Sequence, residues 1–445
     1  MLLLIVLLLC IFFIVFSSTK LKLHSFLALL FAALGFGLFT GMPLNLIVES
    51  INTGFGNTLG YIGIVIVAGT IIGVFLEYSG GAYTLADKIL KIIGEKRVTH
   101  AMAIIGWFVS IPVFADSGFV ILSPLNKALS KRANISLAGP AIALSLGLIA
   151  THCLVPPTPG PIAAAGIIGA NLGLVILFGV IASFIALFFG WLFSVKVAAR
   201  VHIDPNPEIT QEEIDIKMKE APSAFKALTP IFLPIILIVM KSISDFPTNP
   251  FGEGSAKAVL GFLGEPVIAL LIGVLIAFML PKKKQKGIYS DTGWVGKALK
   301  ISATIILITG AGGAFGKVLQ NSGLADTIGE TMAEINLGMW LPFFIAVIIK
   351  SAQGSSTVAL ITTSSLIAPL MPSLGFDSEI AKALVVLSIG AGAMVVSHAN
   401  DSFFWVVTQM SHMDVKTGYK LQSAGTFVLG VSAAISLWIM GLIFM

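Results

Sequence analysis

Apolar residues fill about ten long runs along the chain, each of roughly 16 to 25 residues, and short polar segments separate these runs. A helix rises about 1.5 Å per residue, so a run of this length can cross a hydrocarbon core about 30 Å thick. The pattern predicts an all-α polytopic protein of the lipid bilayer. Composition agrees, because 56% of the residues are hydrophobic and only 11% are charged, against about 25% charged in a soluble domain. A soluble globular protein is excluded.

Charge and cysteine usage exclude further classes. The net charge of +5 comes from basic residues in short loops, which is typical of membrane topology and not of nucleic-acid binding. The two cysteines, Cys10 and Cys153, lie in apolar runs without the spacing of a disulfide or a metal site, so we expect no metal and no cofactor. The sequence contains no Walker-type phosphate loop, zinc-protease motif or nucleophile elbow, which favours coupling to an ion gradient over ATP-driven transport or hydrolysis.

The chain matches itself at an offset of 243 positions. Seven of sixteen positions are then identical, and these pair Gly69, Gly73, Leu76, Ser79, Gly80, Ala82 and Thr84 with Gly312, Gly316, Leu319, Ser322, Gly323, Ala325 and Thr327. Small residues also recur in any membrane protein, because helices pack closely through them. We expect two repeats, residues 1–200 and 226–445, joined by a cytoplasmic connector at 201–225.

Two segments predict re-entrant hairpins. Residues 100–131 have basic residues at both ends, which favours the cytoplasm for both, and their two apolar arms of about 13 residues reach only about 20 Å each. This hairpin is expected to turn at Phe114–Gly118. Its counterpart, residues 338–371, turns at Lys350–Thr357 and is expected to enter from outside. With about five crossings and one hairpin in each repeat, the second repeat is inverted relative to the first, and both termini are predicted to be periplasmic.

A helix broken at mid-membrane is expected after each hairpin. Residues 137–170 contain four prolines between Pro156 and Pro161, which remove backbone donors and clash with the preceding turn. Residues 380–412 contain the polar stretch Ser397–Ser402, which is tolerated most easily around a cavity. Two hairpin tips and two helix breaks then converge. The free N–H groups and helix N-termini at such breaks suit an anion.

Three ionisable residues stand out at mid-membrane, namely Asp116, Lys350 and Asp401, because a charge there costs about 2.5 to 3.5 kcal/mol. In one interpretation a carboxylate carries a proton and Lys350 binds a substrate carboxylate. In the other, Lys350 and Asp401 form a structural ion pair. His398 is either a proton relay or a hydrogen-bonding strut, and His152 and Thr158 are equally open. The hydroxyl groups between Ser351 and Thr357 suit a polyhydroxylated ligand, although such groups also bond to helix carbonyls.

Four motifs in combination resemble the gluconate permease family: Pro156–Pro161, Gly310–Phe315, Gly354–Ala359 and Ser397–Asp401. The resemblance runs over nearly the whole chain. It implies a bacterial inner-membrane symporter for gluconate or related sugar acids, driven by protons, with some relatives that carry D-serine. It also implies membership of the ion transporter superfamily, whose homodimers have a scaffold domain and a transport domain that moves like an elevator.

Three positions depart from the family pattern, which has Glu at Asp116, His at Thr158 and Arg at Lys350. A lysine presents a point charge where arginine presents a bidentate fork, so the geometry of carboxylate binding differs from that of the gluconate members. The departures bear on which sugar acid is carried.

The sequence therefore predicts a proton-coupled importer of a small, gluconate-like anion, and not an enzyme. The predicted substrate-binding residues are Asp116, Ser117, Gly118, Pro157, Thr158, Pro159, Gly160, Lys350, Gln353, Gly354, Ser355, Ser356, Thr357, Ser397, His398 and Asn400. The predicted proton-coupling residues are Asp116, Asp401 and His398.

Other functions stay open. A carrier of D-serine or another small hydroxy or amino acid is the nearest alternative, because Asp116 could bind an ammonium group. Sodium coupling is a second, since helix breaks offer carbonyl oxygens. A channel would need a continuous polar stripe through the membrane, and an intramembrane hydrolase would have only Asp116 and Asp401 as a candidate pair.

Overall fold

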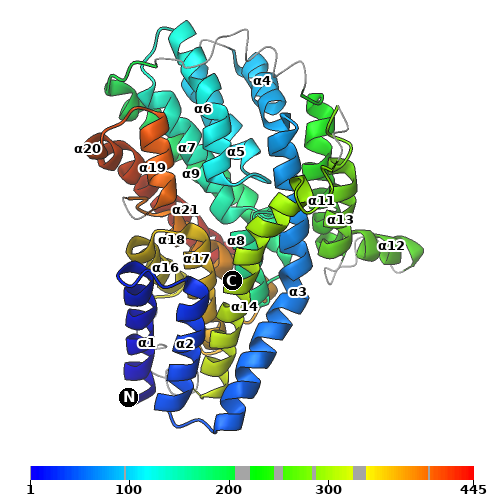
Figure 1. Cartoon of the computed structure of the whole chain (residues 1–445), viewed down its shortest axis with the longest axis vertical. Coiled ribbons are helices and arrows are strands. Elements are labelled where there is room, and N and C mark those ends of the chain that lie inside the picture. The colour runs from blue at the N-terminus through cyan, green and yellow to red at the C-terminus, as the bar shows by residue number, and fades with distance from the viewer. Residues whose placement is uncertain are drawn as a thin grey trace.

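The computed structural model of the protein describes residues 2–94, 97–205, 221–244, 254–282, 287–323, 337–398 and 401–445. Within these ranges the chain forms helices joined by turns, without a strand (Figure 1). The predicted all-α fold class is confirmed. Most of the connector predicted at 201–225 lies outside the described residues, and so does Asn400.

The helices of the first part of the chain run from blue to green in Figure 1. They are α1 (Leu2–Thr19), α2 (Ser25–Phe39), α3 (Leu44–Tyr78), α4 (Gly81–Ile93), α5 (Val98–Val109), α6 (Ala115–Arg132), α7 (Ala138–Leu154), α8 (Pro159–Ile168) and α9 (Leu172–Lys196). The later helices are α11 (Ala224–Ser244), α12 (Ser255–Leu263), α13 (Pro266–Ala277), α14 (Trp294–Asn321), α16 (Trp340–Gln353), α17 (Ser356–Ile367), α18 (Glu379–Met394), α19 (Ser402–Met410), α20 (Val415–Gly418) and α21 (Ala424–Phe444).

Five helical segments of the described chain are long and apolar enough to cross a membrane, and there are up to seven if each of two bent pairs is one span. The five are Ala138–Ile168, Leu172–Arg200, Ala224–Ser244, Trp294–Asn321 and Val415–Phe444. The bent pairs are the two parts of α3, at 45°, and α12 with α13, at 64°. α5, α16 and α17 are shorter apolar helices, as the sequence predicted for hairpin arms.

The first short pair of helices, α5 and α6, turns earlier than the sequence suggested. α5 ends at Val109 and α6 begins at Ala115, so the turn occupies residues 110–114 and contains Pro112. The residues Asp116–Gly118, which were expected to form the turn, lie in the first turn of α6 instead. They therefore present a helix N-terminus.

The second short pair, α16 and α17, is separated by two residues. Gly354 has a φ of +90°, which glycine adopts without the clash of a Cβ atom. The hydroxyl of Ser355 then caps α17 by accepting a hydrogen bond from the backbone N–H of Val358 at 3.3 Å. The turn lies within the range that the sequence predicted.

Both predicted helix breaks are present. The first break, residues 155–158, separates α7 from α8 and contains the Pro156–Pro157 pair. The second break lies between α18, which ends at Met394, and α19, which begins at Ser402, and the structure describes its residues 395–398 and 401. Every residue of α7 is buried, and so is α18 from Ala383 onward. Because protein surrounds the two breaks, their irregular backbone is shielded from lipid.

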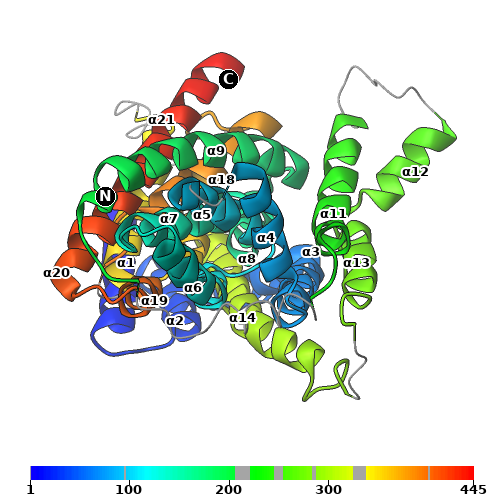
Figure 2. The same cartoon turned by 90° about the horizontal axis from the view of Figure 1, so that it is seen from above.

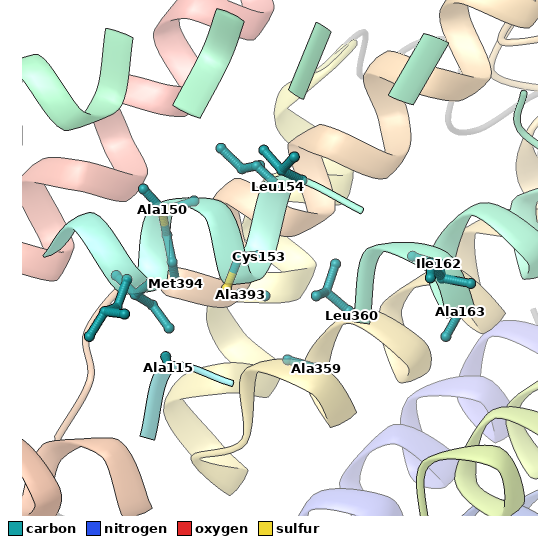
Figure 3. Packing of buried hydrophobic residues seen from close by; sticks show 14 of the residues in the cluster. Ala115, Ala150, Cys153, Leu154, Ile162, Ala163, Ala359, Leu360, Ala393 and Met394 are labelled. Atoms are coloured by element: carbon teal, nitrogen blue, oxygen red, sulfur yellow. The ribbon is translucent and has the colours of Figure 1, made fainter. Parts of the chain in front are cut away.

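The two parts of the chain interlock around these breaks. α3 packs along α14, α6 packs against α19, and α8 packs against α17. α11, α12 and α13 lie to one side of the bundle in Figure 2. Figure 3 shows the centre, where buried apolar side chains of α6, α7, α8, α17 and α18 face one another. Segments that are distant in sequence therefore form one core.

We expect Gly73→Ala to destabilise the protein. Gly73 of α3 lies against the turn between α5 and α6, and a Cβ atom there would fall well inside van der Waals contact with the carbonyl oxygen of Pro112. Overpacking against backbone costs about 1 to 3 kcal/mol, so the melting temperature of the purified protein should fall by several degrees. Gly56→Ala in the same helix is the matched control, because no atom lies within 4 Å of its Cβ position. Equal melting temperatures for the two variants would contradict the close packing.

Candidate functional site

A buried ion pair lies at the centre of the molecule. The Nζ atom of Lys350 is 2.7 Å from Oδ2 of Asp401, and the two side chains are only 1% and 6% exposed. Lys350 belongs to the last turn of α16 and also donates to the carbonyl oxygen of Gly354. Asp401 precedes α19 and caps it by accepting from the N–H of Phe403 at 3.1 Å. The pair therefore ties the tip of the second short pair to the second break.

Side chains of the C-terminal segment hold Asp401 in place. The hydroxyl of Ser397 donates to Asp401 Oδ2 at 2.6 Å. The backbone N–H of Ser397 donates to Oγ1 of Thr426 at 3.0 Å, and the hydroxyl of Ser423 donates to the Ser397 carbonyl. Ser423 ends a π-helical turn, residues Tyr419–Ser423, a conformation that often marks functional sites. Together with Lys350 and the N–H of Phe403, Ser397 gives the buried carboxylate three donors.

The backbone of the second break is strained. Val396 has a φ of +53°, in the left-handed region, which costs a branched L-residue roughly 1 to 2 kcal/mol and is retained most often near functional sites. Nearby, Nε2 of His398 lies 2.8 Å from the carbonyl oxygen of Ser351. A carbonyl only accepts, so Nε2 carries the proton and donates. This geometry is that of a strut between the break and α16.

Asp116 joins the first short pair to the second break. It lies half-buried in the first turn of α6, where its Oδ1 accepts a hydrogen bond from the hydroxyl of Ser402 at 3.2 Å. The charges of Lys350 and Asp401 both act on it. The next residue, Ser117, interacts with the carboxylate of Glu77 on α3. Asp116 therefore lies between the ion pair and the Ser117–Glu77 contact with α3.

The remaining predicted residues of the first repeat lie where α8 meets α17. Pro157, Thr158, Pro159 and Gly160 are all buried. The hydroxyl of Thr158 donates to the carbonyl oxygen of Val155 at 2.8 Å, inside the break itself. A Cβ on Gly160 would lie 3.7 Å from the Cα of Thr357, so the two helix N-termini are in contact. Gly118 packs beside Leu148 of α7.

The predicted residues of the second short pair differ in their exposure. Ser355 is exposed and caps α17, Ser356 is buried, and Thr357 is half-buried. Ser356 interacts with the thiol of Cys153 at the end of α7. The side chain of Gln353 is outside the described part of the structure.

Four helix N-termini meet around this ion pair. α6 approaches α19 through the Ser402–Asp116 hydrogen bond, and α8 approaches α17 at Gly160 and Thr357. The first N–H groups of a helix lack partners within it, and the helix dipole places a partial positive charge there. The arrangement favours a small anion beside Lys350.

Sequence reasoning did not single out Glu77, Ser423 or Thr426, and it named Ser402 only as the end of the polar stretch Ser397–Ser402. Glu77 is the residue before the last of α3 and follows a long apolar run, so the sequence gives no sign of its partner on α6. Ser423 and Thr426 occupy an apolar helix, in which a hydroxyl usually bonds to the preceding turn. Only the cluster of polar residues around Asp401 offered a signal, since its backbone needs donors and acceptors from neighbouring helices.

These features define the class of protein. Apolar membrane-length helices, two helices broken at the protein centre and a buried charge pair at the breaks are the features of a secondary transporter. The model of GntP family permeases matches residues 1–443, and the chain belongs to this family.

Relatives named as permeases or transporters match almost the whole chain. An uncharacterized permease of Haemophilus influenzae is 36% identical, over 98% of this chain and 92% of its own. A gluconate permease of Pseudomonas aeruginosa is 34% identical (96% and 94%), and the D-serine transporter DsdX of Escherichia coli K12 is 33% identical (96% and 95%). The crystal structure of the YdaH transporter of Alcanivorax borkumensis has a similar fold, with a TM-score of 0.59 at 19% identity over 88% of each chain. The protein is a transporter and not an enzyme.

Proposed function

We propose that this protein takes up gluconate or a related small sugar acid across the bacterial inner membrane by proton symport. The observation that carries the proposal is the buried Lys350–Asp401 pair at the meeting point of four helix N-termini. Lys350 and the N–H groups that begin α17 would bind the substrate carboxylate. The hydroxyl groups of Ser356, Thr357 and Thr158 stand nearby for the substrate hydroxyls.

The ion pair supplies a physical basis for coupling. When Asp401 is charged, it pairs with Lys350. Binding of a substrate carboxylate would then give the enclosed site an excess negative charge, which is costly. When Asp401 is protonated, Lys350 is free to pair with the substrate. Proton and anion therefore favour each other's binding, which is the thermodynamic requirement for symport. Asp116 and His398 are the other proposed members of this path.

Alternating access is proposed to follow the repeat. α5, α6, α7 and α8 recur as α16, α17, α18 and α19 at almost the interval of the sequence match, which supports two inverted repeats at 1–200 and 226–445. Gly69 of α3 lies so close to the first break that a Cβ there would be 2.8 Å from the carbonyl oxygen of Pro157. We propose that contacts of this kind, which carry no side chain, let the short helices move like an elevator against α3 and α14. A homodimer with periplasmic termini completes the proposal.

We expect purified protein in proteoliposomes to accumulate labelled gluconate under an inward proton gradient without sodium. A protonophore should abolish accumulation, and excess D-serine should leave it unchanged. A D-serine carrier also has a specific observation in its favour, because Asp116 could pair with an ammonium group. Inhibition by D-serine would indicate D-serine in place of the sugar acid as substrate, and uptake only with sodium would indicate sodium in place of the proton as coupling ion. Absence of gluconate uptake would overturn the proposal.

A further inference from the structure

His152 is a buried residue of the proposed site that has no role so far. It belongs to the last turn of α7, directly before the first break, and is only 7% exposed. Its ring lies 6.1 Å from the ring of Phe114, at the turn between α5 and α6. The charges of Lys350 and Asp401 both act on it. His152 therefore faces the same centre as the ion pair, from the opposite broken helix.

The Nδ1 atom of His152 is buried and has no hydrogen-bond partner among the described residues. Leaving a buried polar atom unpaired costs about 1 to 3 kcal/mol, and native proteins do so rarely. Two hydroxyl groups of the predicted site have other partners: the Thr158 hydroxyl donates to the carbonyl oxygen of Val155, and the Ser356 hydroxyl interacts with the thiol of Cys153. Other buried side-chain atoms of the described residues also lack a partner, but on His152 the charges of Lys350 and Asp401 both act, so its unpaired nitrogen can be satisfied by a ligand that reaches the ion pair.

We infer that His152 binds the substrate directly and that its Nδ1 pairs with a hydroxyl group of a polyhydroxy acid. This inference rests on the proposed function and adds a residue that selects among substrates. The carboxylate already has Lys350 and the N–H groups of α17. An imidazole nitrogen either donates or accepts, and a hydroxyl can do both, so the two groups are complementary.

Pairing with one hydroxyl makes His152 a specificity residue. A site built to hydrogen-bond a substrate hydroxyl rejects an analogue that lacks it, because its own polar group is then left unpaired. Gluconate should therefore bind more tightly than the one deoxy analogue whose missing hydroxyl faces His152. The other deoxy analogues should lose no affinity through this residue.

The test is a cycle of variants and analogues on the whole protein. Binding of gluconate and of its 2-, 3-, 4-, 5- and 6-deoxy analogues is measured in proteoliposomes as competition with the counterflow of labelled gluconate. The proteins are the wild type, His152→Leu, His152→Asn and His152→Gln. His152→Leu should weaken the binding of gluconate about 10-fold or more. It should not weaken the binding of the one deoxy analogue that lacks the hydroxyl facing His152. His152→Asn, which keeps a polar atom close to the Nδ1 position, should restore most of the affinity, and His152→Gln, which places it near Nε2, should not.

The outcomes separate the inference from the proposed function. Equal losses for all analogues in His152→Leu would show a purely structural role and overturn the inference. Unchanged affinity in every variant would overturn it as well, while gluconate counterflow by the wild type would leave the proposed function standing. If the wild type binds none of the sugar acids, the proposed function fails first, and the role of His152 falls with it.

Discussion

Lys350→Met should reduce gradient-driven gluconate uptake by about 100-fold or more, since a charge-assisted hydrogen bond to the substrate is lost. It should also lower the melting temperature, because removing one partner of a buried pair leaves the other uncompensated, at a cost of about 3 to 5 kcal/mol. Asp401 is only 6% exposed, so water cannot replace the lost partner. Uptake in proteoliposomes and thermal unfolding of the same preparation measure the two effects.

Two control variants separate binding from stability. Lys350→Arg keeps the charge and should retain uptake with an altered KM, because its planar fork holds a carboxylate differently. The double variant Lys350→Met with Asp401→Asn removes both charges and should recover much of the stability without recovering transport. Wild-type uptake by the double variant would show that the pair is structural only and that the substrate binds elsewhere.

The sequence predicted those parts of the fold that depend on local chemistry. Prolines Pro156–Pro161 forbid a continuous helix, and the first break lies among them. The apolar arms predicted two pairs of helices, and α5, α16 and α17 are short, whereas α6 has 18 residues and is longer than the arm predicted for it. The first turn was placed a few residues too late, because Asp116–Gly118 looked like turn residues, whereas Pro112 and the packing of Gly73 on its carbonyl set the turn. That packing involves α3, which no local pattern reveals.

The site was predictable only where a charge interrupts an apolar run. Lys350 and Asp401 stood out for that reason, and the sequence left open both a functional and a structural pair. The structure places them 2.7 Å apart. The contacts that the sequence could not supply join residues far apart in the chain. Ser402 and Asp116 are separated by 286 positions, and a hydroxyl on a membrane helix carries no sign of so distant a partner.

Asp401→Asn should abolish gluconate accumulation driven by a proton gradient while retaining exchange of internal for external gluconate. The amide keeps the shape of the carboxylate. Its oxygen can still accept from the N–H of Phe403, and its NH2 group can donate to the Ser397 hydroxyl, but it cannot take up a proton and no longer neutralises Lys350. Lys350 is then permanently available, so the substrate still binds and crosses, uncoupled from the proton. Accumulation and counterflow, measured side by side on one preparation, distinguish this from loss of binding.

Two further variants decide whether Asp401 is the carrier. Asp414→Asn removes a carboxylate that caps α20 at the surface, where Oδ1 accepts from the N–H of Thr417 at 2.8 Å, and it should leave both assays unchanged. Asp116→Asn alters the half-buried carboxylate bonded to Ser402. If only Asp116→Asn loses accumulation while retaining exchange, Asp116 and not Asp401 is the proton carrier. If Asp401→Asn and Asp116→Asn both accumulate gluconate normally, neither carboxylate carries the proton, and competition for Lys350 cannot be the basis of coupling.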